Sequence, residues 1–114
     1  MTKRIAIPMA QGKLSLHFGH CEQFAVIDIE NGKIVKEALF NPPEHQPGTY
    51  PRFLAEKGVN DVVVGGIGQK AIEIFNANSI RVHTGAQAKS MADLVDDYIN
   101  DRLVTGMNNC DGGC

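Results

Sequence analysis

The sequence lacks any long run of apolar residues. None of its runs approaches the roughly 18 residues that a membrane-spanning helix needs. The apolar part of the amino-terminal stretch, residues 1–8, is also too short for a signal peptide. We therefore expect a cytoplasmic protein with no membrane partner.

Cysteine and positive charge are both scarce. Three cysteines are an odd number and cannot all pair in disulfides, and cytoplasmic thiols stay reduced. The cysteines therefore favour metal binding or redox chemistry. The 11 Lys and Arg residues against 13 Asp and Glu residues give a net charge of −2, which argues against a nucleic-acid partner. At 114 residues, with 43% hydrophobic and 21% charged residues, the chain is typical of one soluble domain with a real core.

Five short runs rich in strand-forming residues are joined by turns and by helical patterns. Pro8 should end or bulge the first strand because it has no N–H to donate to a ladder. Asn31-Gly32 between two strand-like runs predicts a β-hairpin, since both turn positions need positive φ. The predicted strands are residues 4–9, 24–29, 34–40, 61–64 and 79–83, and the predicted helices are residues 49–58, 69–75 and 87–103.

The order of these elements predicts the fold class. Strands and helices alternate in the second half, which implies right-handed crossovers and parallel strands, while the hairpin adds antiparallel pairing. We expect an α/β fold, a single domain over residues 1–104 with one five-stranded mixed sheet flanked by helices in a ribonuclease H-like arrangement. Residues 105–114 lack periodicity and are predicted to form a flexible, Cys-containing tail.

Catalytic motifs are absent from the sequence. There is no GxSxG motif of serine hydrolases and no HExxH motif of metalloproteases. A ribonuclease H-type nuclease holds its metal ions with several carboxylates that begin on the first strand, yet residues 4–9 include no acid. We expect a protein that is not an enzyme. The alternatives are a small hydrolase, a dithiol oxidoreductase using Cys110 and Cys114, and a regulatory interaction domain.

The densest group of metal-binding side chains lies in the predicted loop after the first strand. His17, His20 and Cys21 fall within five residues, and transition metals and iron–sulfur clusters prefer imidazole and thiolate ligands. We do not expect all three side chains to bind the same metal atom, because neighbouring side chains in an extended segment point to opposite faces. We favour His17, since Gly19 lets the backbone approach a bulky ligand. The alternatives are a solvated loop anchored by Phe18 and, for His20, an ordinary surface position.

A second candidate site is the glycine loop, Gly65-Gly66-Ile67-Gly68, between a predicted buried strand and a helix. Such a position is where doubly wound sheets bind ligands, and bare backbone N–H groups at a helix amino terminus suit an anion. The loop has neither the P-loop spacing nor a full GxGxxG motif. A tight turn that needs positive φ explains the glycines equally well.

The third candidate is the pair Cys110 and Cys114 near the end of the chain. Two thiolates at this spacing suit a soft metal, or they form a disulfide after purification. Two ligands are too few for a closed zinc site, so Cys21, His17 or a second chain would have to complete the set. Incidental cysteines on a fraying terminus are the alternative. The remaining histidines, His45 and His83, are interpreted as incidental.

Two motifs and a strand led by Phe24 resemble the nitrogenase iron-molybdenum cofactor accessory family, which includes NifX and the carboxy-terminal part of NifB. The resemblance extends from Lys3 to about Leu103. The CxxxCxxC motif of the radical-enzyme domain in full-length NifB is absent, so the chain is not expected to build a cluster precursor. The two motifs are Ser15-x-His17-Phe18-Gly19 and Gly65-Gly66-Ile67-Gly68-x-x-Ala71.

The resemblance implies a ribonuclease H-like fold without nuclease activity. It also implies an iron–sulfur or molybdenum–iron–sulfur cluster, the iron-molybdenum cofactor or a precursor, bound as cargo during cofactor assembly. His17 is the implied ligand, with His20, Cys21 and the tail cysteines as further metal-binding candidates. Phe18, Gly19 and the glycine loop would help to hold the cluster. The implied partners are metallocofactor assembly proteins, with this chain as a monomer or weak homo-oligomer.

Overall fold

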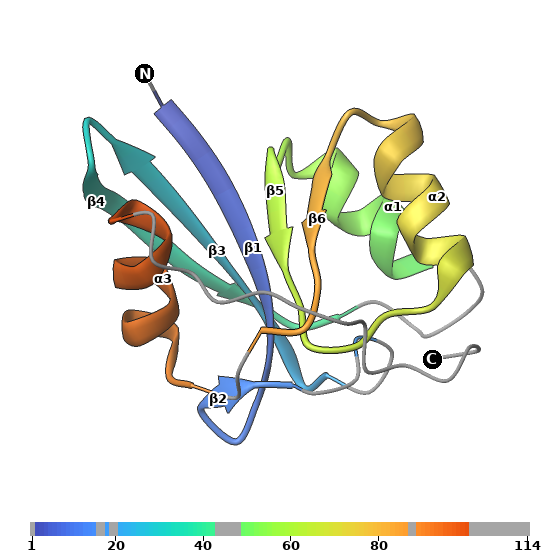
Figure 1. The fold of residues 1–114 in the computed structure, drawn as a ribbon, viewed down its shortest axis with the longest axis horizontal. Helices are drawn as coiled ribbons and strands as arrows, with labels where there is room; N and C mark the ends of the chain where they lie inside the picture. Colours follow the sequence, from blue (N-terminus) through green and yellow to red (C-terminus); the bar gives the residue numbers. More distant parts are fainter. Residues whose placement is uncertain (1, 16–17, 19–20, 43–48, 87–88, 101–114) are drawn as a thin grey trace.

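Helices cover both faces of one sheet in the computed structural model, which describes residues 2–15, 18, 21–42, 49–86 and 89–100 (Figure 1). Two helices lie on one face and the third lies on the other. The strands are β1 (Thr2–Ala10), β2 (Lys13–Leu14), β3 (Gln23–Glu30), β4 (Lys33–Phe40), β5 (Asp61–Val63) and β6 (Arg81–His83), and the helices are α1 (Thr49–Glu56), α2 (Gln69–Ala77) and α3 (Met91–Ile99).

The strand order β4-β3-β1-β5-β6 combines antiparallel and parallel pairing. β3 pairs antiparallel with β1 and β4, whereas β5 pairs parallel with β1 and β6. This confirms the predicted α/β fold with a mixed sheet and flanking helices. The ribonuclease H-like label and the domain boundary at residue 104 stay predictions, and residues 101–114 lie outside the described part of the chain.

The sheet has six strands, so the predicted number of five is wrong. The additional strand, β2, pairs antiparallel with the end of β1, matching Met9 with Leu14. Gln11 and Gly12 form the turn between them with φ of 54° and 79°, as a two-residue hairpin turn requires. A strand of two residues shows no periodicity, which is why the sequence pattern assigned it to a loop.

The expectation that Pro8 ends or bulges the first strand is also wrong. β1 runs through Pro8, which pairs with Phe24 of β3. The Pro8 carbonyl oxygen accepts a hydrogen bond from the Ser15 amide at 2.8 Å. The nitrogen and carbonyl of one strand residue point to the same side, so the missing N–H lies on the Ser15 side and not on the side of β3. The ladder to β3 therefore loses no donor at this position.

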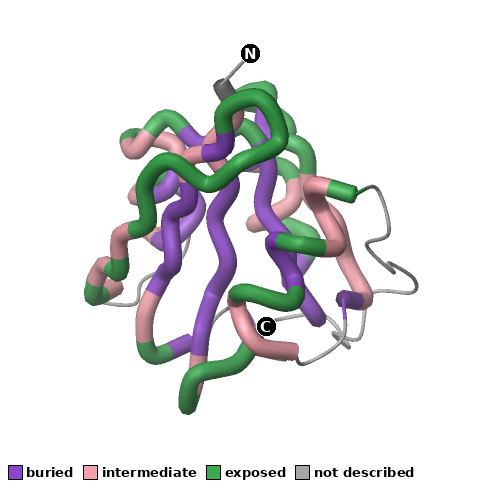
Figure 2. Tube along the Cα trace, turned by 90° about the vertical axis from the view of Figure 1, so that its left-hand side faces the viewer, coloured by how far each residue is buried: buried purple, intermediate pink, exposed green. Residues whose placement is uncertain are grey.

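The central strands of the sheet are buried (Figure 2), and their alternating side chains build two cores. Ile5 and Ile7 of β1 face α3 and pack with its Leu94 and Val95. Ala6 faces the opposite side, where the core lies between the sheet and helices α1 and α2. Because β1 and β3 are buried on both faces, they are nearly continuous apolar runs in the sequence.

Helix α3 begins at Met91, four residues later than predicted. Ser90 is its N-cap, and the Ser90 hydroxyl oxygen accepts a hydrogen bond from the Asp93 amide at 3.3 Å. The Lys89 carbonyl is instead bonded to the Leu14 amide of β2 at 3.0 Å. Pairing with β2 thus holds residue 89 in an extended segment. No helix in the described part of the chain is long and apolar enough to cross a membrane.

The predicted hairpin between β3 and β4 is confirmed, and its turn offers a test of the backbone. Gly32 has φ of 77°, and a Cβ added there would meet only Ile99 Cγ2, at 3.8 Å. The cost of Gly32→Ala is therefore conformational and not steric, and we expect the free energy of unfolding to fall by about 1 kcal/mol. Urea denaturation measures the change. The control Lys33→Ala, on extended backbone, should change stability by less than about 0.5 kcal/mol; equal losses would contradict this interpretation.

Candidate functional site

A backbone hydrogen bond joins the two sequence motifs. The Phe18 amide donates to the Gly66 carbonyl oxygen at 2.9 Å, so Phe18 lies directly against the glycine loop that follows β5. His17, Gly19 and His20 lie outside the described residues, and the roles predicted for them stay predictions.

The Phe18 ring anchors the first motif in the core on the α1/α2 face. Its side chain is buried among three aromatic rings at centroid distances of 5.6 to 6.0 Å. The rings of Tyr50 and Phe75 meet it edge-on, a favourable arrangement for aromatic pairs. Phe24, at the start of β3, completes the group. The alternative interpretation, in which Phe18 is a core anchor, agrees with this burial, and the predicted role of Phe18 in cofactor binding stays a prediction.

The glycines of the second motif serve a different purpose from a positive-φ turn. Gly65, Gly66 and Gly68 are buried, and none of them has a positive φ, so that explanation is wrong. The Gly65 carbonyl oxygen accepts from the Gly85 amide at 2.8 Å, and the Gly66 carbonyl accepts from Phe18. Two neighbouring segments thus bond to the glycine loop through their backbones. The glycine loop is therefore a buried connection that is bonded to the chain on two sides.

The glycine loop leads directly into helix α2. Gly68 is the N-cap, with φ of −73° and ψ of 154°, and no described side chain caps the helix. N–H groups in the first turn of a helix have no partner within it and carry partial positive charge. The local backbone therefore suits an anionic ligand, as the sequence predicts. Binding of a cofactor at this loop stays a prediction.

Cys21 packs in the core on the α1/α2 face. It is 8% exposed, and burial raises the pKa of its thiol to about 12. A thiol with such a pKa is protonated at neutral pH, whereas metals bind the thiolate. In this position Cys21 acts as a small apolar side chain, and its predicted supporting role as a ligand stays a prediction.

The other sequence-predicted metal ligands cannot be placed. Cys110 and Cys114 lie outside the described residues, as do His17 and His20. His45, interpreted above as incidental, lies outside them as well. Among the described residues, no three or more His, Cys, Asp or Glu side chains gather as a metal would require.

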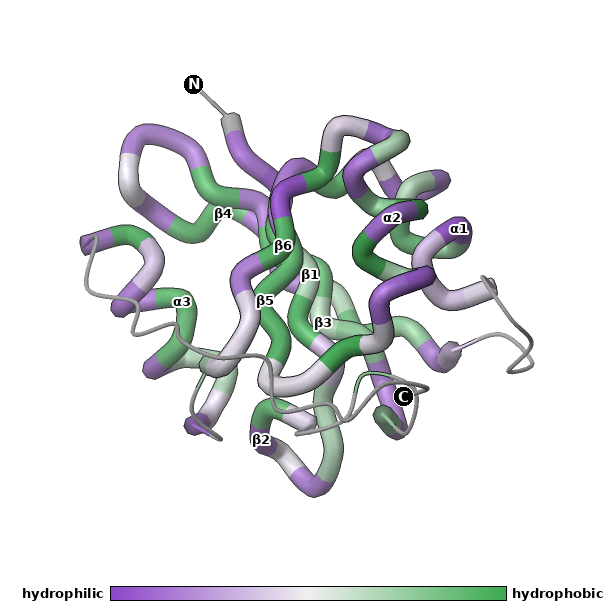
Figure 3. Tube along the Cα trace, turned by 45° about the vertical axis from the view of Figure 1, so that its right-hand side comes forward, coloured by the Kyte–Doolittle hydropathy of each residue, from purple (hydrophilic) through white to green (hydrophobic). Residues whose placement is uncertain are grey.

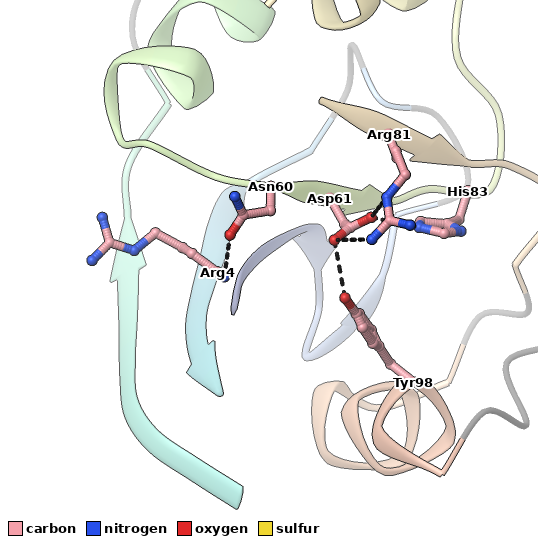
Figure 4. Close-up of polar contacts among 6 residues, drawn as sticks. All are labelled: Arg4, Asn60, Asp61, Arg81, His83 and Tyr98. Atoms are coloured by element: carbon pink, nitrogen blue, oxygen red, sulfur yellow. Dashed lines mark hydrogen bonds and ion pairs between the residues drawn. The ribbon is translucent and has the colours of Figure 1, made fainter. Parts of the chain in front are cut away.

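A polar cluster on the α3 face, absent from the sequence-based predictions, surrounds Asp61 (Figure 4). Asp61 Oδ1 accepts from Arg81 Nε at 2.8 Å and lies 3.0 Å from His83 Nε2. The Tyr98 hydroxyl donates to Asp61 Oδ2 at 2.9 Å. The cluster joins β5, β6 and α3, so it fixes the helix to the sheet. His83, interpreted above as incidental, is one of its members.

The ionisation of the cluster follows from its contacts. Asp61 is fully buried, which alone would raise the pKa of its carboxyl group, but hydrogen bonds from His83, Arg81 and Tyr98 outweigh burial and lower it. Burial and the neighbouring carboxylate raise the pKa of Tyr98 to about 12. At neutral pH the cluster therefore contains a carboxylate and a neutral phenol.

The sequence holds one signal for this cluster. An acid begins a buried strand, and Arg and His stand two residues apart on the next strand.

Comparison with known proteins identifies relatives over most of the chain. Residues 1–101 match the family described as dinitrogenase iron-molybdenum cofactor. The uncharacterized protein MJ0580 of Methanocaldococcus jannaschii is 36% identical over 105 residues, 88% of each chain. The crystal structure of PH0822 matches at 31% identity with a TM-score of 0.84, covering 90% of this chain and 93% of that one.

A more distant structure shares the fold. The apo form of the orange protein from Desulfovibrio gigas matches with a TM-score of 0.78 at 19% identity, covering 93% of this chain and 94% of that one. The family match includes both sequence motifs and agrees with the resemblance drawn from them. This chain belongs to the dinitrogenase iron-molybdenum cofactor family.

Proposed function

We propose that this protein binds and carries an iron–sulfur or molybdenum–iron–sulfur cluster, the iron-molybdenum cofactor or a precursor, in metallocofactor assembly. The observation that supports this proposal most directly is the hydrogen bond from the Phe18 amide to the Gly66 carbonyl, which joins the two sequence motifs. Family membership supports an accessory role in dinitrogenase cofactor biology. The protein acts without catalysis, in the cytoplasm, as a monomer or weak homo-oligomer that exchanges its cargo with assembly proteins.

The roles follow from the chemistry of each segment. His17 is the principal ligand, and His20 supports it from the same loop. The amides of the glycine loop and of the first turn of α2 stabilise the negative charge of the cluster. Cys110 and Cys114 act as a clamp, since soft thiolates suit such metals. Cys21, protonated in the core, is the weakest member of the proposed ligand set.

The fold supports cargo exchange. The candidate ligands come from a loop and from the end of the chain, attached to a sheet whose central strands are buried on both faces. Ligands on loops of a rigid scaffold allow cargo to enter and leave. The scaffold is ribonuclease H-like, and its first strand offers no acid to hold catalytic metal ions.

The first test is removal of the proposed principal ligand. We expect His17→Ala to lower cluster affinity by about tenfold or more while changing the free energy of unfolding by less than about 0.5 kcal/mol. The protein is purified anaerobically from iron-replete cells, and bound iron, molybdenum and sulfide are measured together with the visible spectrum. Urea denaturation of the apoprotein measures stability separately.

His45→Ala is the matched control, because it removes a histidine outside both motifs and should leave the spectrum unchanged. A chain truncated after Leu103 tests the clamp, and its cluster should dissociate faster. A wild-type protein that is colourless and takes up no added cluster would contradict the proposal. A large stability loss in His17→Ala would instead make His17 a structural residue.

A further inference from the structure

The outer edge of β4 carries an unusual concentration of exposed apolar side chains. β4 is the last strand on its side of the sheet, so its outer backbone groups have no neighbouring strand in the described chain. The strand includes hydrophobic residues (Figure 3). The large apolar side chains that are exposed in the described residues all belong to it: Ile34 at 40%, Val35 at 57% and Leu39 at 58%. An apolar edge strand with free backbone groups is a template for another strand.

A basic hollow flanks β4 on the α1/α2 face. It measures about 80 Å³, and its lining includes Arg4, Asp28, Lys36, Phe40 and Lys57. Asp28 is paired with Arg4 at 2.6 Å, and Lys57 Nζ lies 4.4 Å from the centre of the Phe40 ring. Three cations face one carboxylate, so the hollow keeps a positive charge.

An apolar hollow flanks the same strand on the α3 face. It measures about 230 Å³ and is mostly apolar: the side chains of Met9, Leu39 and Met91 line it, and Gln11, Gly12, Glu22 and Gln23 complete the lining. Leu39 pairs with Ala25, whose side chain belongs to the core beneath α3, which places this hollow on the opposite face from Lys36. Methionine-lined surfaces adapt to varied apolar side chains. The two hollows thus offer opposite chemistry on opposite faces of one strand.

A second copy of this chain fits the edge poorly in the registers centred on residues 36 to 38. Continuing the sheet across a two-fold axis places a residue near the strand centre opposite its own counterpart. A register centred on Lys36 places the two Lys36 side chains opposite each other, and a register centred on Glu37 does the same with the two Glu37 side chains. Like charges in directly opposite positions are destabilising. A register centred on Ala38 places Lys36 opposite Phe40 and Glu37 opposite Leu39. In none of these registers do unlike charges oppose each other.

We propose that the outer edge of β4 binds an extended segment of another protein that alternates acidic and large apolar residues. Successive side chains of a strand point to opposite faces. A carboxylate of the segment therefore lies over the basic hollow beside Lys36, and the next apolar side chain enters the hollow beside Leu39. Backbone hydrogen bonds to β4 supply affinity, and the two hollows supply specificity. The interaction uses none of the proposed cluster ligands and stands independently of the cluster.

The test uses a synthetic peptide of about seven residues in which glutamate and leucine alternate. N-methylation of every second amide leaves one pairing edge free and prevents the peptide from forming sheets with itself. Two versions, methylated on the leucines or on the glutamates, expose opposite edges. Fluorescence anisotropy measures binding to the full-length protein. We expect saturable binding of at least one version, weakened about tenfold by Lys36→Glu through reversal of a cross-strand charge pair.

Matched variants separate this surface from general charge effects. Lys70→Glu makes the same charge change on exposed α2 and should leave binding unchanged. Leu39→Ser should weaken binding by severalfold, and both β4 substitutions are at exposed positions, so circular dichroism should show an intact fold. The proposal is overturned if neither peptide binds, if a lysine–leucine peptide binds equally well, or if sedimentation shows a wild-type dimer that Leu39→Ser dissolves.

Discussion

Replacing Asp61 with alanine is expected to lower the free energy of unfolding by about 3 kcal/mol. The carboxylate is fully buried and accepts hydrogen bonds from groups on β6 and α3. Hydrogen bonds to a charged group contribute about 1.5–3 kcal/mol each, which the cost of burying the carboxylate partly offsets. Arg81 is 64% exposed and regains water when its partner is lost, so the loss should not reach the roughly 5 kcal/mol seen when a charge is left buried and unpaired.

The pH dependence of stability distinguishes this cluster from simple packing. The folded-state pKa of Asp61 lies below its ordinary value of 3.8, so its contribution is present above pH 3.8 and is lost as the pH falls through the folded pKa. Wild type should therefore lose more stability on acidification than Asp61→Asn. Asp28, whose pKa the Arg4 hydrogen bond lowers, titrates in both proteins and cancels in the difference.

The variant Tyr98→Phe tests the cluster at alkaline pH. In the folded wild-type protein the pKa of Tyr98 is raised from 10.0 to about 12. The contribution of the phenol to stability is therefore complete below pH 10 and is lost as the pH rises toward 12. Wild type should show this alkaline loss in urea denaturation and Tyr98→Phe should not. Equal pH profiles for wild type and both variants would mean that the cluster does not stabilise α3 on the sheet.

The sequence predicted the elements whose signal is local. Asn31 and Gly32 specify the hairpin through their own backbone preferences, and the structure gives them φ of 52° and 77°. The apolar runs of β1 and β3 predict central strands because both of their faces are buried. Such features need no knowledge of distant residues.

The features that the sequence did not predict depend on tertiary contacts. β2 exists because the turn at Gln11 brings two residues back against β1, and a pair so short has no period. The Asp61 cluster joins residues up to 37 positions apart, so no spacing rule connects Tyr98 with a strand. The predicted start of α3 is too early because Ser90 pairs with Lys13 of β2 and has extended backbone, although the sequence pattern there is helical.

Replacing Phe18 with alanine is expected to cost about 4 kcal/mol of unfolding free energy. The side chain is 2% exposed and contacts three aromatic rings, so truncation leaves a cavity and removes edge-to-face contacts. Phe18→Leu keeps most of the volume and should cost about 1–2 kcal/mol. Urea denaturation of the apoprotein measures both losses.

Phe75→Leu separates the anchoring of the first motif from general stability. Phe75 is fully buried on α2 and packs edge-on against Phe18, so its truncation should cost a similar free energy. Leucine at position 18 keeps the amide that bonds to Gly66, but repacking of the smaller side chain shifts the backbone next to the proposed ligand His17. A change at Phe75 is not adjacent to His17 in the chain. Phe18→Leu should therefore speed cluster loss severalfold more than Phe75→Leu at equal stability. Equal rates of cluster loss would mean that the aromatic core supports the fold and leaves the geometry of the first motif unaffected.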